Sequence, residues 1–193
     1  DEGQYNDIRE VFWTSGAAMV VRTDVFKKLG GFDKDYFAHM EEIDFCWRAK
    51  RAGYKCFVDG RTEIYHLGGG TLEYDNPKKV FLNFRNSLAT IIKNEQKRYV
   101  ALTFLARLVL DGVAGLKFLL EGKYKNTFAI IQAHFSIYNN IFNLWNKRAN
   151  NSTLIKKYRI NKLNNQGRYN RVIVLDYYIR GLKTFDKIRK NYF

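Results

Sequence analysis

The sequence has little proline and little cysteine. Pro77 is the single proline among 193 residues, which fits a helix-rich second half. The two cysteines, Cys46 and Cys56, are too few for a disulfide framework, so we expect reduced thiols in a cytosolic protein. A zinc site would need further ligands at closer spacing, so this pair does not predict one.

The chain also lacks an initial methionine and an apolar run near its start. Its first ten residues, DEGQYNDIRE, do not resemble a secretory signal, and we expect that an N-terminal part is missing. Hydrophobic residues make up 46% of the chain and aromatic residues 16%, which excludes wholesale disorder and predicts a packed core. The length suits one domain, or one domain with an appendage.

Acidic residues are scarce in the second half. Residues 1–76 hold 10 Lys/Arg and 14 Asp/Glu, a net charge of −4, whereas residues 77–193 hold 23 and 5, a net charge of +18. This asymmetry predicts a surface for anionic lipid or nucleic acid on the second half.

Residues 1–76 predict a mixed α/β segment of short elements. The segments 23–32 and 41–54 have helical patterns, the first capped by Thr23 or Asp24 and each ended by glycine. Aromatic and β-branched residues predict strands within 10–23 and two short strands, 55–60 and 61–69, on either side of a turn. Residues 66–71 are rich in glycine and predict a loop.

After Pro77 the apolar residues recur at helical spacing. Helices are expected from residue 77 to about 95, over 97–121 and over 124–148, the last with an apolar side from Phe128 to Trp145. Residues 149–170 predict a polar loop or a poorly ordered segment. Beyond them we expect a strand or helix and then a short basic helix.

Three interpretations of the segment 100–120 stay open, because it is long enough to cross a membrane but contains Arg107, Asp111 and Lys117. We favour an amphipathic helix packed in a bundle over a helix lying in the membrane interface. A true span is least favoured because charges inside a membrane are costly.

Acidic residues cluster at the start of the helix expected over 41–54. On a helix, Glu41, Asp44 and Arg48 share one face, and Asp44 pairs with Arg48 at i, i+4. The helix dipole also favours carboxylates at this end. The cluster therefore has a structural explanation, yet an ionised carboxylate held there can also accept a proton from an attacking hydroxyl.

The order of residues around this cluster resembles the second half of family 2 glycosyltransferases, inverting GT-A enzymes that use a sugar nucleotide. The pattern is an apolar strand begun by glycine, a GGFD turn, an aromatic residue, an acidic helix start followed by arginine, and a histidine before glycines. The matching residues lie within 11–95 and are Gly16, Gly30, Gly31, Phe32, Asp33, Phe37, Glu41, Glu42, Asp44, Arg48, Gly53, His66, Gly68, Gly69, Gly70, Arg85 and Asn86.

The resemblance implies roles for these residues. Glu42 stands where the family usually has aspartate, and it is implied to be the general base, with a reach one methylene longer. The other implied roles are acceptor binding or orientation for Glu41, Asp44, Trp47 and Arg48, metal or diphosphate contact for His66, a loop over the site for Gly68, Gly69 and Gly70, and a donor-side helix for Arg85 and Asn86.

The resemblance also implies a metal, Mg²⁺ or Mn²⁺, that neutralises the donor diphosphate and is held by an upstream D-x-D motif. The string from Asp33 to Asp35 has this spacing but lies in the GGFD turn, which argues against it. The expected motif and the nucleotide-binding units would precede Asp1. We therefore expect a fragment that lacks the donor-binding half and is inactive alone.

The expected fold class is α/β: a partial GT-A (Rossmann-like) half-domain with short strands and helices, followed by a mostly α-helical C-terminal region. The expected divisions are the C-terminal half of a catalytic domain at 1–76, amphipathic helices at 77–148 and a basic tail at 149–193.

The expected reaction is inverting sugar transfer from a nucleoside diphosphate sugar to a hydroxyl of a glycan or lipid-linked acceptor, in polysaccharide biosynthesis. We expect it in the cytoplasm or peripherally on the inner face of the cell membrane, touched by the basic helices, and a homo-oligomer stays open. The alternative is a non-catalytic basic module that binds nucleic acid or anionic membrane. Nucleic acid is disfavoured because residues 77–193 lack a recognition motif.

Overall fold

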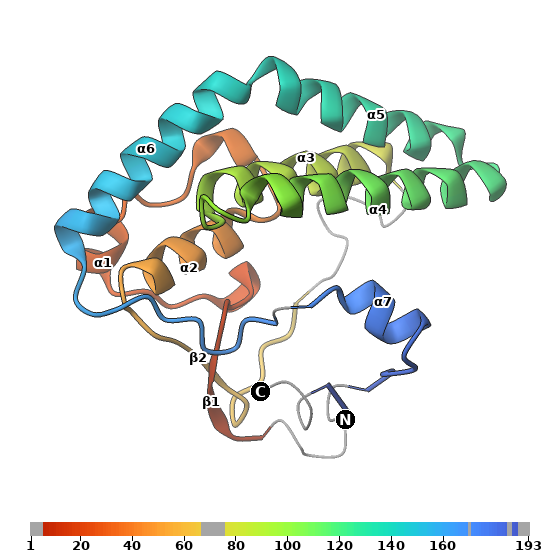
Figure 1. Ribbon diagram of the computed structural model, residues 1–193. Coiled ribbons are helices and arrows are strands. Elements are labelled where there is room, and N and C mark those ends of the chain that lie inside the picture. Colours follow the sequence, from red (N-terminus) through yellow and green to blue (C-terminus); the bar gives the residue numbers. More distant parts are fainter. Residues whose placement is uncertain (1–5, 67–75, 170, 185–186, 189–193) are drawn as a thin grey trace.

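A computed structural model describes residues 6–66, 76–169, 171–184 and 187–188. It is an α/β chain in which a layer of long helices lies over a mixed part with short helices and one small sheet (Figure 1). The elements in chain order are β1 (Ile8–Val11), η1 (Gly16–Ala18), α1 (Thr23–Lys28), η2 (Lys34–Tyr36), α2 (Glu41–Arg51), β2 (Cys56–Asp59), α3 (Pro77–Asn94), α4 (Val100–Leu120), α5 (Tyr124–Asn139), α6 (Ile141–Tyr158) and α7 (Ile173–Tyr178).

The sheet consists of β1 and β2, which pair antiparallel from Ile8 opposite Asp59 to Val11 opposite Cys56. The expected strand at 61–69 is wrong for 61–66, because Arg61 folds back and donates to the Asp59 carboxylate at 2.8–2.9 Å. Strand structure within 10–23 is also shorter than expected. The chain leaves β1 after Val11, and residues 16–18 form the short helix η1.

The two short helices lie where the sequence placed them. The predicted cap of α1 is wrong, because Arg22 occupies the cap position and its side chain makes no capping hydrogen bond. Asp24 instead pairs with Lys28 at 3.0 Å. Helix α2 ends as expected before Gly53, whose φ of 90° suits glycine, and a side chain there would meet the backbone of Asn161 at 2.6 Å.

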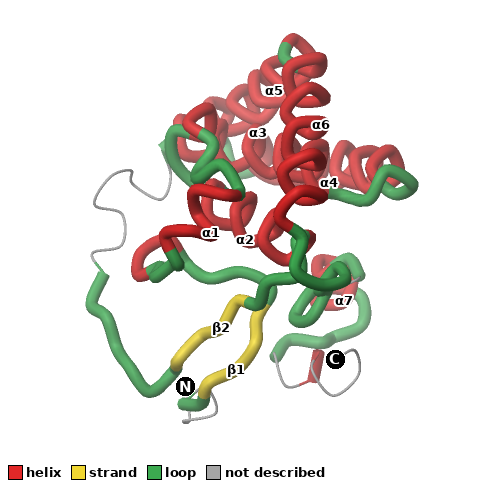
Figure 2. Tube along the Cα trace, turned by 90° about the vertical axis from the view of Figure 1, so that its left-hand side faces the viewer, coloured by secondary structure: helices red, strands yellow, loops and turns green. Residues whose placement is uncertain are grey.

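The helical layer differs from the expected one at its second half. Helices α3 and α4 are confirmed, but the single helix expected over 124–148 is wrong, since the chain bends at Asn140 and continues as α6. Residues 149–158 are helical rather than a loop, so α6 runs through the division expected at 149. Figure 2 shows α3 to α6 together, with the strands below them.

The end of α6 packs against the mixed part of the chain. Ile155 joins a buried apolar cluster with Leu29, Phe45 and Ala52 from α1, α2 and their ends. The chain then returns along α2 and donates from the Ile160 amide to Ala52 O at 2.9 Å. Residues 155–160, which lie in the segment expected to be a tail, therefore pack on the mixed part.

The C-terminal region contains α7, which settles the alternative of strand or helix over the first part of 171–190 in favour of helix. The short basic helix expected at its end lies largely outside the described residues. A membrane-crossing helix, with the length and apolarity that this requires, is not found among the described residues.

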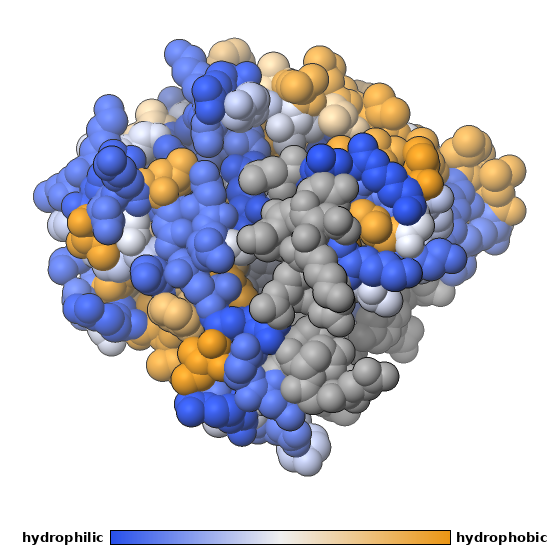
Figure 3. Space-filling view, turned by 60° about the horizontal axis from the view of Figure 1, so that its bottom comes forward, coloured by the Kyte–Doolittle hydropathy of each residue, from blue (hydrophilic) through white to orange (hydrophobic). Residues whose placement is uncertain are grey.

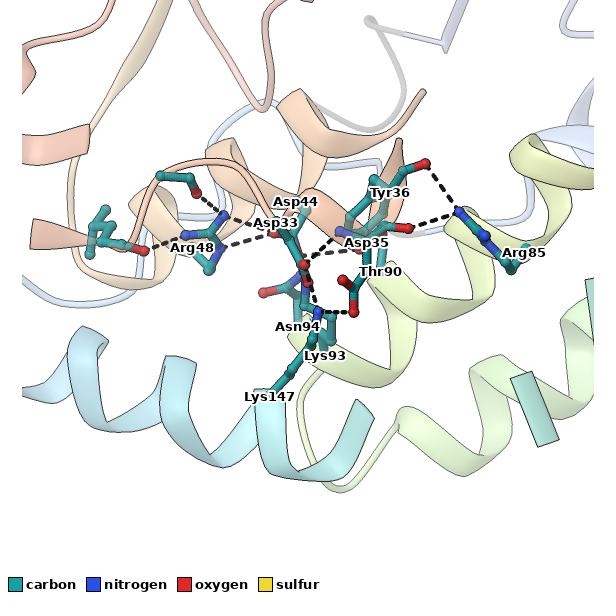
Figure 4. A network of polar contacts seen from close by, with 12 residues as sticks. Asp33, Asp35, Tyr36, Asp44, Arg48, Arg85, Thr90, Lys93, Asn94 and Lys147 are labelled. Atoms are coloured by element: carbon teal, nitrogen blue, oxygen red, sulfur yellow. Dashed lines mark hydrogen bonds and ion pairs between the residues drawn. The ribbon is translucent and has the colours of Figure 1, made fainter. Parts of the chain in front are cut away.

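A network of charged and polar side chains joins the mixed part to the helical layer (Figure 4). Lys93 of α3 contacts Asp33 at 2.8 Å and Asp44 at 2.9 Å, and Lys147 of α6 contacts Asp33 and Asp35 at 2.6 Å. Burial acts to raise the pKa of Asp33, but the ammonium groups of Lys147 and Lys93 outweigh it and hold the pKa at about 2.

The pKa of Asp33 predicts acid sensitivity. Because the pKa falls from 3.8 to about 2 on folding, the stabilisation is present above about pH 4 and is lost as the pH falls to about 2. We expect Asp33→Asn to lower the free energy of unfolding by roughly 1–2 kcal/mol at pH 6, and the difference from wild type to shrink between pH 4 and 2. Urea unfolding at a series of pH values measures this. A difference that does not change with pH would contradict it, and Asp7→Asn, at an exposed carboxylate, is the control.

Candidate functional site

The candidate site is built on a turn with unusual backbone geometry. Phe37, His39 and Met40 have φ values of 63°, 68° and 74°. These values lie in the positive-φ region, which residues other than glycine rarely adopt. Glu41 and Glu42 follow directly and start α2. Such geometry persists only where the surrounding structure enforces it, and it gathers at functional sites.

Two side chains of α3 enforce the turn. The Asn86 amide, in a residue only 1% exposed, donates to the carbonyl oxygens of Tyr36, Ala38 and His39 at 2.8–3.0 Å. Arg85 donates to the carbonyl oxygens of Asp35 and Tyr36 at 2.9 and 3.1 Å (Figure 4). The pair predicted to lie on a donor-side helix therefore positions the turn that precedes the acids.

Glu42 lies half-buried at the first turn of α2 and faces Gly16. A Cβ placed on Gly16 would lie 3.7–3.9 Å from the Glu42 side chain, so the two segments are in close contact. Burial raises the pKa of the Glu42 carboxyl, and the negative charge of Glu41 raises it further. A raised pKa makes the ionised carboxylate a stronger proton acceptor, which suits a general base.

Unpartnered polar atoms lie in the residues that directly precede Glu42 in the chain. Oε2 of Glu41 and Nε2 of His39 are buried and make no hydrogen bond. Buried polar groups are normally hydrogen-bonded, and exceptions cluster where a ligand or water completes the set. The sequence predicted Glu41 at this site, whereas His39 was not among the predicted site residues.

Asp44 and Arg48 anchor the helix that carries Glu42. Asp44 is fully buried and accepts from Arg48 Nε at 3.0 Å and Asn94 at 2.7 Å, in addition to its contact with Lys93. Arg48 also donates to Leu29 O and, at 2.7 Å, to Gly31 O. This arrangement suits the orienting role rather than acceptor contact, because neither charged group reaches the surface.

Trp47 lies on the other side of α2, towards β1. Its ring meets the Phe12 ring edge-on at a centroid distance of 5.5 Å, and the Arg168 guanidinium lies 4.8 Å from its centre. Both contacts have a packing explanation. Acceptor binding by Trp47 remains a prediction.

His66 is exposed at the end of a described segment, and the predicted loop of Gly68, Gly69 and Gly70 lies outside the described residues. Across the described part of the chain, no three His, Cys, Asp or Glu side chains are arranged to hold a metal ion. The described residues therefore do not form a metal site of their own.

Sequence reasoning named Asn86 but missed the rest of a polar stripe on α3. The stripe comprises Asn86, Thr90, Lys93 and Asn94, all at most 3% exposed and all turned towards η2 and α2. Their spacing of i, i+4, i+7 and i+8 places them on one helix face, and this was a readable signal. Apolar residues lie between them in the sequence, and these residues dominate the helical periodicity of this segment.

Comparison with known proteins gives partial relatives. The chain is 38% identical over 58 residues to an N-acetylglucosaminyl-diphospho-decaprenol L-rhamnosyltransferase of Mycobacterium tuberculosis, covering 30% of this chain and 19% of that protein. It is 41% identical over 54 residues to the Escherichia coli rhamnosyltransferase WbbL, covering 28% and 20%.

An archaeal relative extends the match. The low-salt glycan biosynthesis hexosyltransferase Agl10 of Haloferax volcanii is 28% identical over 88 residues, which are 44% of this chain and 28% of that protein. The matches thus span about a fifth to just over a quarter of the length of these curated relatives. No protein-family model matches the chain, and no solved structure matches it. The partial relatives are all named as sugar transferases, which supports a relationship to glycosyltransferases.

The contacts of Asn86 predict a large effect of a small change. Asn86→Asp removes the donor and places a carboxylate oxygen against three carbonyl oxygens. We expect the free energy of unfolding to fall by about 2–3 kcal/mol and the amides of residues 37–40 to exchange hydrogen faster. Urea unfolding and hydrogen exchange measure the two effects. Asn83→Asp on the same helix is the control, and equal losses in both variants would contradict the role.

The burial of Asp44 predicts a second large effect. Asp44→Asn keeps the shape of the side chain but leaves the cations of Arg48 and Lys93 without their shared carboxylate. We expect a loss of about 3–5 kcal/mol, the usual cost of breaking a buried ion pair. Thermal and chemical unfolding measure it, and a loss below about 1 kcal/mol would show that the network is not needed.

Proposed function

We propose that this chain is the acceptor-side part of a family 2 glycosyltransferase of GT-A fold. The complete enzyme transfers a sugar from a nucleoside diphosphate sugar to a hydroxyl of a glycan or lipid-linked acceptor, with inversion. The observation that carries the proposal is the placement of Glu42, a half-buried carboxylate of raised pKa that follows an enforced turn. The partial relatives support the reaction class.

Glu42 acts as the general base in a single displacement. The acceptor oxygen forms a bond to the anomeric carbon while the bond from that carbon to the diphosphate oxygen breaks. The hydroxyl proton passes to the Glu42 carboxylate, and the bonding electron pair leaves with the nucleoside diphosphate. A single displacement on the opposite face inverts the anomeric configuration.

The other residues support this step. Asn86 and Arg85 hold the turn, and Asp44 with Arg48 fixes α2, so the Glu42 carboxylate is positioned before the acceptor arrives. Glu41 and His39 offer unpartnered atoms for acceptor hydroxyls. His66 is the proposed metal or diphosphate contact, and Gly68, Gly69 and Gly70 are the proposed loop over the site. The remaining donor-binding groups, and the residues that would hold the Mg²⁺ or Mn²⁺ ion, belong to parts of the proposed enzyme outside the described residues.

The acceptor class is proposed from the names of the relatives. One relative is named for N-acetylglucosaminyl-diphospho-decaprenol, a sugar joined through diphosphate to a long lipid, and another for glycan biosynthesis. We assign this chain an acceptor of the same chemistry, a sugar hydroxyl on a lipid diphosphate carrier.

Glu42→Gln tests the general base. In the complete enzyme we expect kcat to fall by about 100-fold or more, because the amide cannot accept the proton. The acidic limb of the pH profile of kcat/KM should disappear, since protonation of Glu42 causes it. Release of nucleoside diphosphate from sugar nucleotides, with a lipid-linked acceptor present, is the measurement.

Stability separates this effect from misfolding. Because burial raises the pKa of Glu42, the folded state disfavours its ionised form, and this cost is present above the folded pKa. A neutral glutamine removes the cost, so the melting temperature at pH 7 should stay equal or rise. Glu121→Gln, at an exposed acid between α4 and α5, is the control. Retained turnover in a folded Glu42→Gln enzyme would remove Glu42 from the role.

A further inference from the structure

Helix α4 has its charged and apolar sides reversed relative to a surface helix. Asp111 is 2% exposed and contacts Arg107 at 2.8 Å and His134 of α5 at 3.1 Å, while Arg107 also donates to Ser87 of α3 at 3.1 Å. Arg107 and Asp111, two of the three charges that interrupt the apolar segment, therefore point into the bundle, whereas Lys117 is exposed. A surface helix normally turns its charges outward and its apolar residues inward.

The outer face of α4 is apolar along its whole length. Its exposed large side chains recur every three or four residues and are 53–80% exposed: Leu102, Leu105, Val109, Val113, Leu116, Leu119 and Leu120. About five helical turns of such residues far exceed the scattered single apolar residues of an ordinary surface. Lys117 is the charged residue beside this stripe.

Helix α5 repeats the arrangement. Its small or aliphatic residues Ala129, Ala133 and Ile137 face the core, whereas the large residues expected on one apolar side face outward. The exposed set runs from α5 into α6 and comprises Tyr124, Phe128, Ile131, Phe135, Tyr138, Phe142 and Trp145. Figure 3 shows apolar residues gathered at the right, where the joined ends of α4 and α5 lie in Figure 1.

The surface around these stripes is cationic. Among acids of the described helical half, Glu95, Asp111 and Asp176 are buried in ion pairs, and Glu121 is exposed. Basic residues lie at the ends of the two helices, with Lys97 and Arg98 before α4 and Lys117, Lys123 and Lys125 around the α4–α5 turn. These basic side chains give the ends of the two helices a positive surface.

We propose that the outer face of α4 and α5 docks on an anionic lipid bilayer, with both helices lying in the plane of the interface. The apolar stripes enter the boundary between headgroups and acyl chains, and the flanking lysines meet lipid phosphates. A second copy of this chain is the weaker occupant because it brings the same positive charge. Tyr124 and Trp145, at the ends of the α5–α6 stripe, suit the headgroup level.

Docking is independent of the proposed sugar transfer, because it rests on the helical half and not on Glu42. It is measured without donor or acceptor, so a failure of either proposal leaves the other standing.

Vesicle co-sedimentation of the full chain tests the proposal. The vesicles are phosphatidylcholine alone, or phosphatidylcholine with about a third phosphatidylglycerol as the anionic lipid. We expect binding to the anionic vesicles that is at least about tenfold stronger than to the neutral ones. The double variant Leu102→Gln and Val109→Gln should weaken it about tenfold or more.

A matched control uses equally exposed apolar residues elsewhere. Leu102 and Val109 are each 68% exposed, and Ile64 and Ile160 are 65% and 63% exposed outside both helices. The variant with Ile64→Gln and Ile160→Gln should bind like wild type, and circular dichroism checks that both variants fold. Lys117→Gln with Lys125→Gln should reduce the preference for anionic lipid. Equal vesicle binding by the two double glutamine variants would overturn the proposal. So would a wild-type chain that does not bind vesicles but forms a dimer in light scattering, if Leu102→Gln with Val109→Gln abolishes that dimer.

Discussion

One carboxylate, that of Asp44, holds the two parts of this chain in register. It lies fully buried where α2 meets α3 and meets cations from both helices, Arg48 and Lys93. Desolvating these charges is costly, and only the complete arrangement offsets the cost. This contact therefore fixes the position of α2 relative to α3. It also fixes the position of Glu41 and Glu42 at the start of α2.

The candidate site inherits its geometry from α3. The turn before Glu41 carries three residues whose backbone angles are unfavourable by themselves, and the Asn86 amide satisfies the carbonyl groups that the turn exposes. On the same helix, the Thr90 hydroxyl forms a hydrogen bond with the Tyr36 hydroxyl at 2.7 Å. The polar side of α3 thus serves the site, while its apolar side, with Leu88 and Ile92, packs against the other helices.

Local signals predicted local features well. The glycine that ends α2, the ion pair of Asp44 with Arg48 and the long helices α3 and α4 follow from periodicity and spacing, and the structure confirms them. The strand partner of β2 was not predictable in this way, because β1 lies 45 or more residues earlier and no local pattern encodes the pairing. The exposure of the large apolar residues of α5 was not predictable for a different reason. Helical spacing shows which residues share a face, but it does not show which face is buried.

The path of residues 160–168 has a consequence for synthesis of the chain. Lys50 is fully buried between the Glu10 carboxylate at 2.7 Å and Gln166 O at 3.1 Å, and Asn164 donates to Glu10 at 2.5 Å. Gly167 has a φ of 78°, and a Cβ atom at this position would lie only 2.6 Å from the Phe12 amide nitrogen, so the close approach requires glycine. As the chain emerges from the ribosome, Lys50 is thus without one of its acceptors until some 116 further residues have been made. The C-terminal end of α2 is therefore completed late in translation, and premature termination anywhere before this segment yields a chain in which Lys50 lacks this acceptor.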